Sequence, residues 1–575
     1  MDKDKDILGR VKGYFEQAVG NAAWQRWQAE AREAFDFYDG DQWSSDEKAK
    51  LADVGQAPIV INKIASKVDN IAGTEVAGRT RILYQSRSGV ANEAETARVL
   101  SDLALYVAER NDQAVELSHV FRDGLVSGIG WLDVGVEDSD EGALIFNRAE
   151  DPFSVVWDPM SRRADMSDMR FVCRERWLSS HDMETMFGEA GMAAFGKGKA
   201  GVPLGGSAAW AMRGAGGESI NYYDGAREVM RVVEVQYLEP TTVWRVRLPS
   251  GAIQLCTDKK DVKRFTALHK GAEVDDASEL MRARVAYFAG DVLLSDEALP
   301  YWHGGFTLIP YVYKRHKKDG RPYGLVRAAV HPQRELNKRR SKAMHLLNTA
   351  QVIADIDAVD DPNVLAREAA RPDGMILKRA GKDLRIIRNT DLAVSQVQIM
   401  ENAGRDIQDV MGVFDEALGR ETNAVSGIAI QQRQMATSLN QMFAFDALRR
   451  TKKRLGEQIL ALMKQHFTHE MAVRITDTFG AGTMIGLNQP LRDDMGREVL
   501  GEDGQSLVQN DPRVGAFDVV VEEVADVASA REREAQQLKL LIDAGVPVPP
   551  EVLVEMSGVR HKREIAAHLS RTVGE

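Results

Sequence analysis

The chain has 575 residues, of which 44% are hydrophobic and 28% charged, so several domains of ordinary globular composition are expected. Its formal net charge of -12 argues against a protein that mainly grips nucleic acid, because that affinity comes mostly from basic side chains. No apolar run reaches the roughly 18 residues that span a bilayer, and the charged start MDKDKDILGR predicts neither a secretory signal nor a membrane partner.

The N-terminal part is predicted to be mostly helical. Residues 5–40 carry aromatic and alanine side chains near helical spacing and stop at Gly40, after which the aromatic segment 37–43 predicts a packed corner. Residues 58–79 begin strand-like and become helical, and 93–126 form a long amphipathic pattern.

Five aspartates occupy the segment 151–188 and allow two interpretations. They are Asp151, Asp158, Asp165, Asp168 and Asp182. Their side chains could shape turns, or their oxygens could bind a hard cation, although the spacing does not match a calcium loop. We favour turns and assign no metal ligand.

The glycine-rich segment 188–219 almost spells a phosphate-binding loop. Gly191 is followed by Gly196 and Lys197, but Gly198 stands where a hydroxyl residue is required. We therefore expect a surface loop, no nucleotide and no other cofactor. Strand-like stretches follow over 228–317, so a mixed α+β region is predicted for 1–315. The two cysteines, Cys173 and Cys256, are expected to be buried free thiols of a reducing compartment.

The middle of the chain predicts a helical rod. A helix over 322–355 leads to a short insert, 356–391, in which VLAREAA reads as a helix and MILKR and LRIIR as strands. A return helix spans 392–417 and a very long helix runs from 428 to about 470. A rod that buries one stripe usually covers the rest against copies of itself, so we expect a ring of identical subunits.

Basic residues are concentrated at the start of this rod. Between 314 and 342 there are eleven basic residues against two acidic ones. This is either a solvated helix face or a surface that meets phosphate or an acidic partner. His466 and His469 have no obvious third metal ligand and are expected at the surface or at a helix end. Strands are predicted over 471–524 and two helices over 529–545 and 549–572.

Six segments, in this order and spacing, resemble the portal proteins of tailed bacteriophages of the podovirus type. They are FYDGDQW with PIVINKIASKVDNIAG, GIGW, VVWDPMSRRADMSDMRFVCRERW, IPYVYKRHKKDGRPYGLVR and SGIAIQQRQ. The resemblance covers nearly the whole chain and implies an α+β portal fold.

The resemblance also implies a division of the chain. The wing would comprise 1–315 together with the long helix and strands of 428–525. Residues 316–355 and 392–417 would form the two-helix stem, 356–391 a small α/β clip, 418–427 the tunnel loop, and 526–575 a helical crown.

The implied function is structural rather than enzymatic. A ring of about twelve copies at one capsid vertex would form the channel for DNA packaging and ejection. Its implied partners are double-stranded DNA, the terminase large subunit, a head–tail adaptor, and scaffolding and capsid proteins. The protein would belong to the virion and be assembled in the host cytoplasm. A non-viral helical scaffold and a nucleotide-dependent DNA translocase are the alternatives.

Three groups of residues are expected to matter for this function. The tunnel-loop residues expected to face DNA are Arg420, Glu421, Thr422 and Asn423. The basic stem residues are Lys338, Arg339, Arg340 and Lys342, some facing the channel and others pairing with acids of the adjacent subunit. The clip residues expected to meet a partner are Lys378, Arg379, Lys382 and Arg385.

Overall fold

The structure is a computed structural model, and the statements below concern the residues that it describes. These are 2–87, 91–139, 142–201, 221–248, 253–371, 374–387, 390–415, 427–467, 471–476, 482–492, 497–500 and 508–523. The expected tunnel-loop residues, the crown, the glycine-rich stretch 202–220 and His469 lie outside them.

The described chain mixes helices and strands throughout. Its helices are α1 (Asp2–Val19), α2 (Ala22–Asp39), α3 (Ser45–Asp53), α4 (Ile64–Ala77), α5 (Ala91–Arg110), α6 (Gln113–Ser127), α7 (Ser180–Gly201), α8 (Lys259–Leu268), α9 (Val326–Asn348), α10 (Pro362–Ala370), α11 (Thr390–Met411) and α12 (Gly427–His466). Its longer strands are β1 (Thr80–Ser86), β2 (Ile129–Ser139), β3 (Gly142–Glu150), β5 (Phe171–Ser179), β7 (Val229–Arg247), β10 (Ser278–Ala289), β11 (Val292–Ala298), β12 (Leu308–Val312), β17 (Met471–Thr476), β18 (Gly482–Leu487) and β21 (Phe517–Glu523). The shorter strands are β4 (Val155–Trp157), β6 (Tyr223–Asp224), β8 (Ile253–Cys256), β9 (Glu273–Val274), β13 (Lys314–Arg315), β14 (Pro322–Tyr323), β15 (Gln351–Ala354), β16 (Leu384–Ile387), β19 (Gln489–Pro490) and β20 (Val508–Gln509).

The body of the molecule is built around two antiparallel sheets. The larger has the strand order β11-β10-β7-β5-β4, with β6, β8 and β9 also paired to the long strand β7. The smaller has the order β12-β2-β3, and all the pairings in both sheets are antiparallel. The antiparallel strands predicted over 228–317 are confirmed, and the mixed body confirms the expected α+β class.

Helix α1 packs on the larger sheet, and α2 meets the edge strand β4 of this sheet. The ring of Trp27 on α2 meets Trp157 of β4 edge-to-face, with ring centroids 4.8 Å apart, and Phe37 and Trp43 are buried at the corner that follows. The predicted packed corner is confirmed. The single helix expected over 5–40 is two helices, because Asn21 caps α2 by accepting a hydrogen bond from the backbone N–H of Ala23.

The glycine-rich segment was predicted to be a surface loop, and its first part is helical instead. Helix α7 extends from Ser180 to Gly201, with a kink at Gly188. Gly191, Gly196 and Lys197 therefore lie in a helix, and no phosphate loop forms there. A Cβ atom at Gly198 would lie 2.7 Å from the Sδ of Met230, so close helix-to-strand packing explains one of these glycines.

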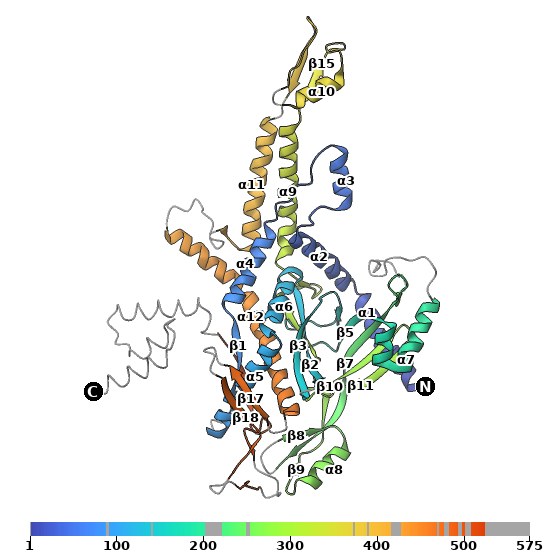
Figure 1. Ribbon diagram of the computed structural model, residues 1–575, viewed down its shortest axis with the longest axis vertical. Helices are drawn as coiled ribbons and strands as arrows, with labels where there is room; N and C mark the ends of the chain where they lie inside the picture. The colour runs from blue at the N-terminus through green and yellow to red at the C-terminus, as the bar shows by residue number, and fades with distance from the viewer. Residues whose placement is uncertain are drawn as a thin grey trace, which may run out of the picture.

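A two-helix rod projects from the body and carries a small insert at its far end (Figure 1). The rod consists of α9 and α11, and the insert contains α10 and the two-stranded sheet β15–β16. The first rod helix was expected to reach residue 355, but it ends at Asn348, and 351–354 form a strand of the insert. MILKR was expected to be a strand and is not one in the isolated chain, whereas LRIIR contains β16.

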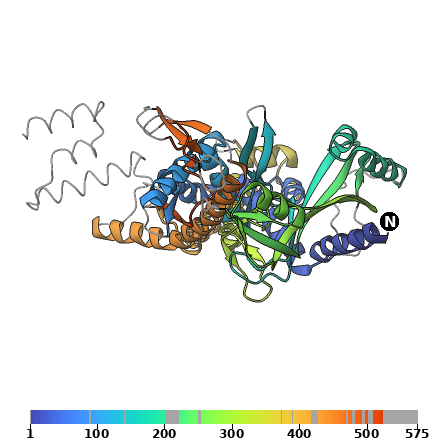
Figure 2. The same cartoon turned by 90° about the horizontal axis from the view of Figure 1, so that it is seen from below.

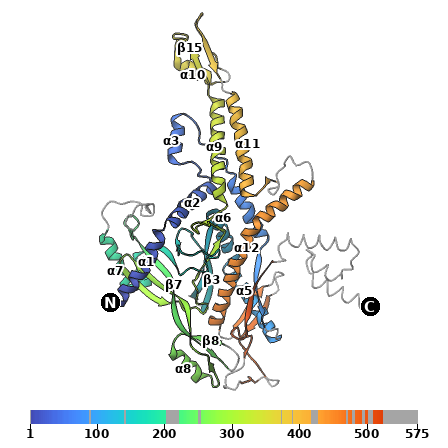
Figure 3. The same cartoon turned by 180° about the vertical axis from the view of Figure 1, so that it is seen from behind.

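The long helix α12 has 40 residues, about 60 Å at 1.5 Å per residue. Its C-terminal half lies in the body, while its N-terminal half extends to one side (Figure 3). Seen from below, this half and the helices α1 and α7 reach out on opposite sides of the body (Figure 2). No helix in the described ranges is long and apolar enough to cross a membrane.

Candidate functional site

The base of the rod is held by buried amide side chains of α9. Gln333 accepts a hydrogen bond from the backbone N–H of Lys63 and donates to the carbonyl of Ile61. Asn337 accepts from the N–H of Ile61 and donates to the side chain of Gln42. Residues 59–63 are half-buried, and an extended backbone segment needs partners for those polar groups that water does not reach. These amides supply them, so the segment predicted as a strand at 58–63 is fixed to the rod without a sheet.

Tight backbone contacts join the rod to the body next to this segment. Gly128 has a φ of 95°, and a Cβ there would lie 2.3 Å from the backbone nitrogen of Tyr323, so only glycine fits. The N–H of Leu325 donates to the carbonyl of Leu125 at 2.7 Å. The rod therefore leaves the body from a rigid joint that fixes its direction.

The four basic stem residues differ in their surroundings. Lys338 pairs with Glu47 of α3 at 2.8 Å, and the hydrogen bond from Lys338 lowers the pKa of Glu47 below its ordinary value. Arg339 pairs with Glu335 at 3.0 Å and donates to Gln396 of α11. Arg340 and Lys342 form no ion pair with any described residue, and Lys342 is exposed. Two of the four cations therefore already have acidic partners in their own chain.

The second rod helix carries the opposite charge. Helix α9 has six basic residues and one acidic residue, whereas α11 has four acidic residues and one basic residue. The acidic side chains of α11 are all exposed, and none is ion-paired within the described residues; they are Asp391, Glu401, Asp406 and Asp409. Four of the six basic residues of α9 pair with Glu30, Glu33, Glu47 and Glu335, so α9 offers Arg340 and Lys342 to its surroundings, whereas α11 offers four carboxylates.

The insert has no such bias. Residues 356–391 contain seven acidic and seven basic residues. Arg379 pairs with Asp360 at 2.5 Å and Arg385 with Asp383 at 3.0 Å, both at the surface. Lys378 donates to the carbonyl of Lys382 at 3.1 Å, and the Lys382 ammonium has no partner among the described residues. The structure does not gather the four basic insert residues into one cationic site.

The connection between α11 and α12 is anchored where it leaves the rod. Lys67 of α4 is buried, donates a hydrogen bond to the carbonyl of Val413, and lies 3.7 Å from the carboxylate of Asp415. A buried ammonium group requires such partners. Arg420, Glu421, Thr422 and Asn423 follow this anchor, outside the described residues.

The phage P22-like portal protein family model matches residues 12–574, nearly the whole chain. The chain belongs to this family. No curated protein matched the chain. Portal proteins are virion components of the head-to-tail connector that take part in viral DNA packaging, and they form rings.

The aspartates of this portal protein make the local hydrogen bonds that turns require. Asp151, Asp158 and Asp165 each accept from the backbone N–H two residues later, and Asp168 accepts from the N–H groups of Arg162 and Arg163. Asp182 accepts from the N–H of Ser179 at the start of α7. These contacts support the turn interpretation, and within the described ranges no group of three or more His, Cys, Asp or Glu is placed to hold a metal ion. Cys173 and Cys256 are free and buried, as expected.

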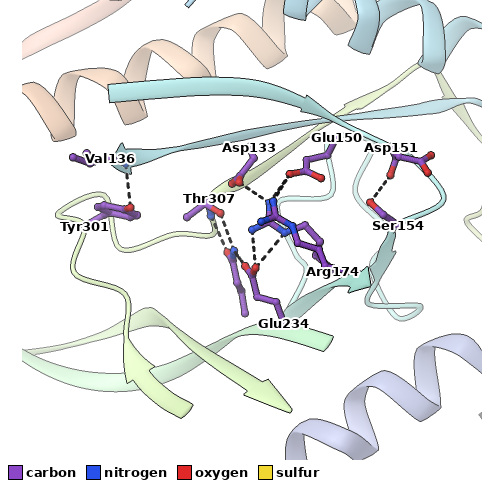
Figure 4. Close-up of polar contacts among 11 residues, drawn as sticks. Asp133, Val136, Glu150, Asp151, Ser154, Arg174, Glu234, Tyr301 and Thr307 are labelled. Carbon is purple, nitrogen blue, oxygen red and sulfur yellow. Dashed lines mark hydrogen bonds and ion pairs between the residues drawn. The ribbon is translucent and has the colours of Figure 1, made fainter. Parts of the chain in front are cut away.

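One buried charge cluster was missed by sequence reasoning. Arg174 of β5 contacts Asp133 of β2 at 2.5 Å, Glu150 of β3 at 2.7 Å and Glu234 of β7 at 2.6 Å (Figure 4). The arginine therefore joins the two sheets of the body. The sequence signal that could have revealed this cluster is the charged residue Arg174, which follows three apolar residues in the strand FVCRERW.

A second omission lies on α12. The run RRTKKR at 449–454 divides between the core and the surface. Lys452 is buried and pairs with the equally buried Glu75 at 3.6 Å, whereas Arg449, Arg450 and Lys453 are exposed. Three apolar side chains earlier on the helix are also exposed: Leu439, Met442 and Phe443. The apolar stripe was predicted, but periodicity could not show that this part of it remains uncovered in one subunit.

Proposed function

We propose that twelve copies of the chain form a closed ring at one capsid vertex, with a central channel for packaging and ejecting double-stranded DNA. In this ring the body is the wing, α9 and α11 are the stem, and the insert is the clip that meets the terminase large subunit and a head–tail adaptor. Scaffolding and capsid proteins meet the outer surface during assembly, and residues 526–575 form the crown. The role is structural and needs no catalytic residue.

The charge difference between the two rod helices is the observation that carries this proposal. A ring requires two different faces on each subunit that fit each other head to tail. The basic α9 of one subunit and the acidic α11 of the next supply such a pair of faces. Arg340 and Lys342 are cations of α9 without an ion pair among the described residues, and Asp406 and Asp409 are matching anions on α11.

Exposed apolar side chains on the same helix support the same arrangement. Leu392, Val394, Ile399 and Val410 are large hydrophobic residues of α11 that one subunit leaves in water. Uncovered apolar groups along a helix indicate a protein interface rather than a solvated surface. The neighbouring stem would cover them in the ring.

The channel is proposed to be lined near its narrowest point by the connection between α11 and α12. Arg420, Glu421, Thr422 and Asn423 would face DNA there, and unpaired stem cations would touch the phosphates in passing. A lining rich in basic residues would bind DNA strongly and hinder its transport. The net charge of -12 fits a channel that passes DNA without holding it.

DNA packaging tests this proposal. Capsids assembled with the wild-type chain should protect DNA from nuclease, and an Arg420→Ala, Asn423→Ala variant should form rings but package DNA at a rate that differs from wild type. Rings that package at the wild-type rate would contradict the channel assignment. The translocase alternative predicts ATP hydrolysis by the purified chain; the portal role predicts none.

A further inference from the structure

The insert at the end of the rod contains an extended segment whose central backbone N–H groups have no hydrogen-bond partner among the described residues. Residues 374–379 run GMILKR, a short apolar run next to a turn that reads as a strand. The backbone N–H groups of Ile376, Leu377 and Lys378 bond to no described residue. The ends are fixed, since Arg379 donates to the carbonyl of Ala358 at 2.9 Å and Met375 to the side chain of Glu368 at 3.3 Å.

Two large apolar side chains of this segment are also exposed to solvent. Met375 is 77% exposed and Leu377 is 80% exposed, while Ile376 between them is half-buried. Two large apolar residues on one face of an extended segment are typical of a strand that packs against another layer. In a single subunit nothing among the described residues covers them.

The neighbouring sheet of the insert is incomplete as well. β15 and β16 pair only with each other among the described strands, so each has an open edge. A two-stranded sheet is marginally stable in water by itself, and an open edge readily accepts a further strand. Ile353 within β15 is 60% exposed, and Ile356 just after this strand is 86% exposed. The β15 edge therefore has free backbone groups and an apolar border.

We propose that residues 375–379 of one subunit add as a strand to the open edge of β15 in the adjacent subunit. Strand addition satisfies the backbone groups on both sides and brings Met375 and Leu377 towards Ile353 and Ile356. The inference rests on the ring proposed above, in which parallel rods hold identical inserts side by side. The edge and the added strand are different surfaces, so the contact repeats around a ring without leaving a free edge.

A second copy of the chain fits this surface better than another protein does. The insert has equal numbers of acidic and basic residues, so it shows no charge bias towards a strongly acidic or basic partner. Both halves of the contact, the open edge and the unpaired strand, are also present in every copy. Each subunit can thus supply the strand that pairs with the open β15 edge of its neighbour.

Hydrogen–deuterium exchange on assembled rings tests the proposal. In rings verified by native mass spectrometry, the amides of 375–379 and 351–354 should exchange at least about tenfold more slowly than in dissociated subunits. Equal rates in rings and subunits would overturn it. So would slow exchange that appears only after an adaptor or terminase is added, since the occupant would then be another protein. Failure to form rings would be seen separately and would contradict the ring itself.

Cysteine cross-linking between different copies tests which edge is used. Subunits carrying Ile353→Cys, mixed with subunits carrying Leu377→Cys before assembly, should form a covalent dimer on oxidation, because the native Cys173 and Cys256 are buried. Neither variant alone should do so, and neither should a mixture of Ile353→Cys with Leu268→Cys, which places the second thiol on exposed α8. A dimer formed only when Ile386→Cys replaces Ile353→Cys would overturn the β15 assignment, and no dimer in either mixture would overturn the pairing.

Discussion

Phe443 and Phe445 lie two residues apart on α12 and meet opposite environments. The ring of Phe445 stacks on Phe121 with centroids 5.6 Å apart, whereas Phe443 is 68% exposed. The first contact stabilises the subunit, and the second side chain is available for a neighbour. Substituting each phenylalanine in turn can therefore distinguish an effect on the stability of the subunit from an effect on ring assembly.

Phe443→Ser should leave the free energy of unfolding of the subunit within about 0.5 kcal/mol of wild type and lower the fraction of subunits found in rings. Phe445→Ala should destabilise the subunit by roughly 2–4 kcal/mol, since it removes a packed aromatic ring. Denaturant unfolding and sedimentation velocity measure the two quantities. If Phe443→Ser assembles like wild type, this part of α12 does not lie at the subunit interface.

Arg174→Met should strongly destabilise the body of the subunit, where Arg174 joins the two sheets. The change leaves Asp133, Glu150 and Glu234 close together without their shared cation, and breaking a buried pair in this way costs about 3–5 kcal/mol. Arg176→Met is the matched control, because Arg176 is half exposed and its pair with Glu150 should contribute less than about 1 kcal/mol. Similar unfolding midpoints for the two variants would show that the cluster does not hold the two sheets together.

The proposed contact between α9 of one subunit and α11 of the next should respond to charge reversal. The double variant Arg340→Glu, Lys342→Glu should reduce ring formation, most clearly at low salt, because unscreened like charges would then face each other across the interface. Adding Asp406→Lys and Asp409→Lys should restore rings. Lys259→Glu on α8 should assemble normally. If the double variant forms rings as well as wild type does, then α9 and α11 of adjacent subunits do not contact each other.

Asp123 of α6 should make the stability of the protein depend on pH. Burial, helped by the nearby charge of Asp151, raises the pKa of Asp123 to about 7. The folded protein thus holds this proton more tightly than the unfolded chain, so the free energy of unfolding should fall as the pH rises from about 4 to about 7. Asp123→Asn should stabilise the protein above pH 7, on the order of 2–4 kcal/mol, and change little near pH 4. Asp276→Asn, at an exposed site, should have no effect at either pH, and a wild-type profile for Asp123→Asn would contradict the buried titration.

The rod and the long helix could be predicted from sequence because helical periodicity is a local signal. The two-helix rod around a small insert, and the strands that follow, came from the spacing of apolar residues alone. Helix ends were less certain: the rod helix ends at Asn348, where the chain turns into β15, because pairing with β16 outweighs local preference. The glycines of 191–198 led to the wrong prediction of a loop. This segment is helical, and Gly198 is explained by its close packing against Met230.

The contacts between distant segments could not be predicted. Arg174 meets its three carboxylates only after two sheets have formed, and Lys452 finds Glu75 across the body. The same holds for the basic stem residues, since Lys338 pairs with Glu47 from a helix far away in sequence. Residues 375–379 illustrate the converse: the sequence predicts a strand, but the segment pairs with no strand in the part of the chain that the structure describes.

Electron microscopy of the purified full-length protein tests the central claim most directly. Closed rings should be seen end-on, with a central channel whose wall contains α9 and α11 and whose projecting end carries the insert. Single subunits at every concentration, or rings in which these two helices lie on the outside, would contradict the assignment of the rod as the wall of a shared channel.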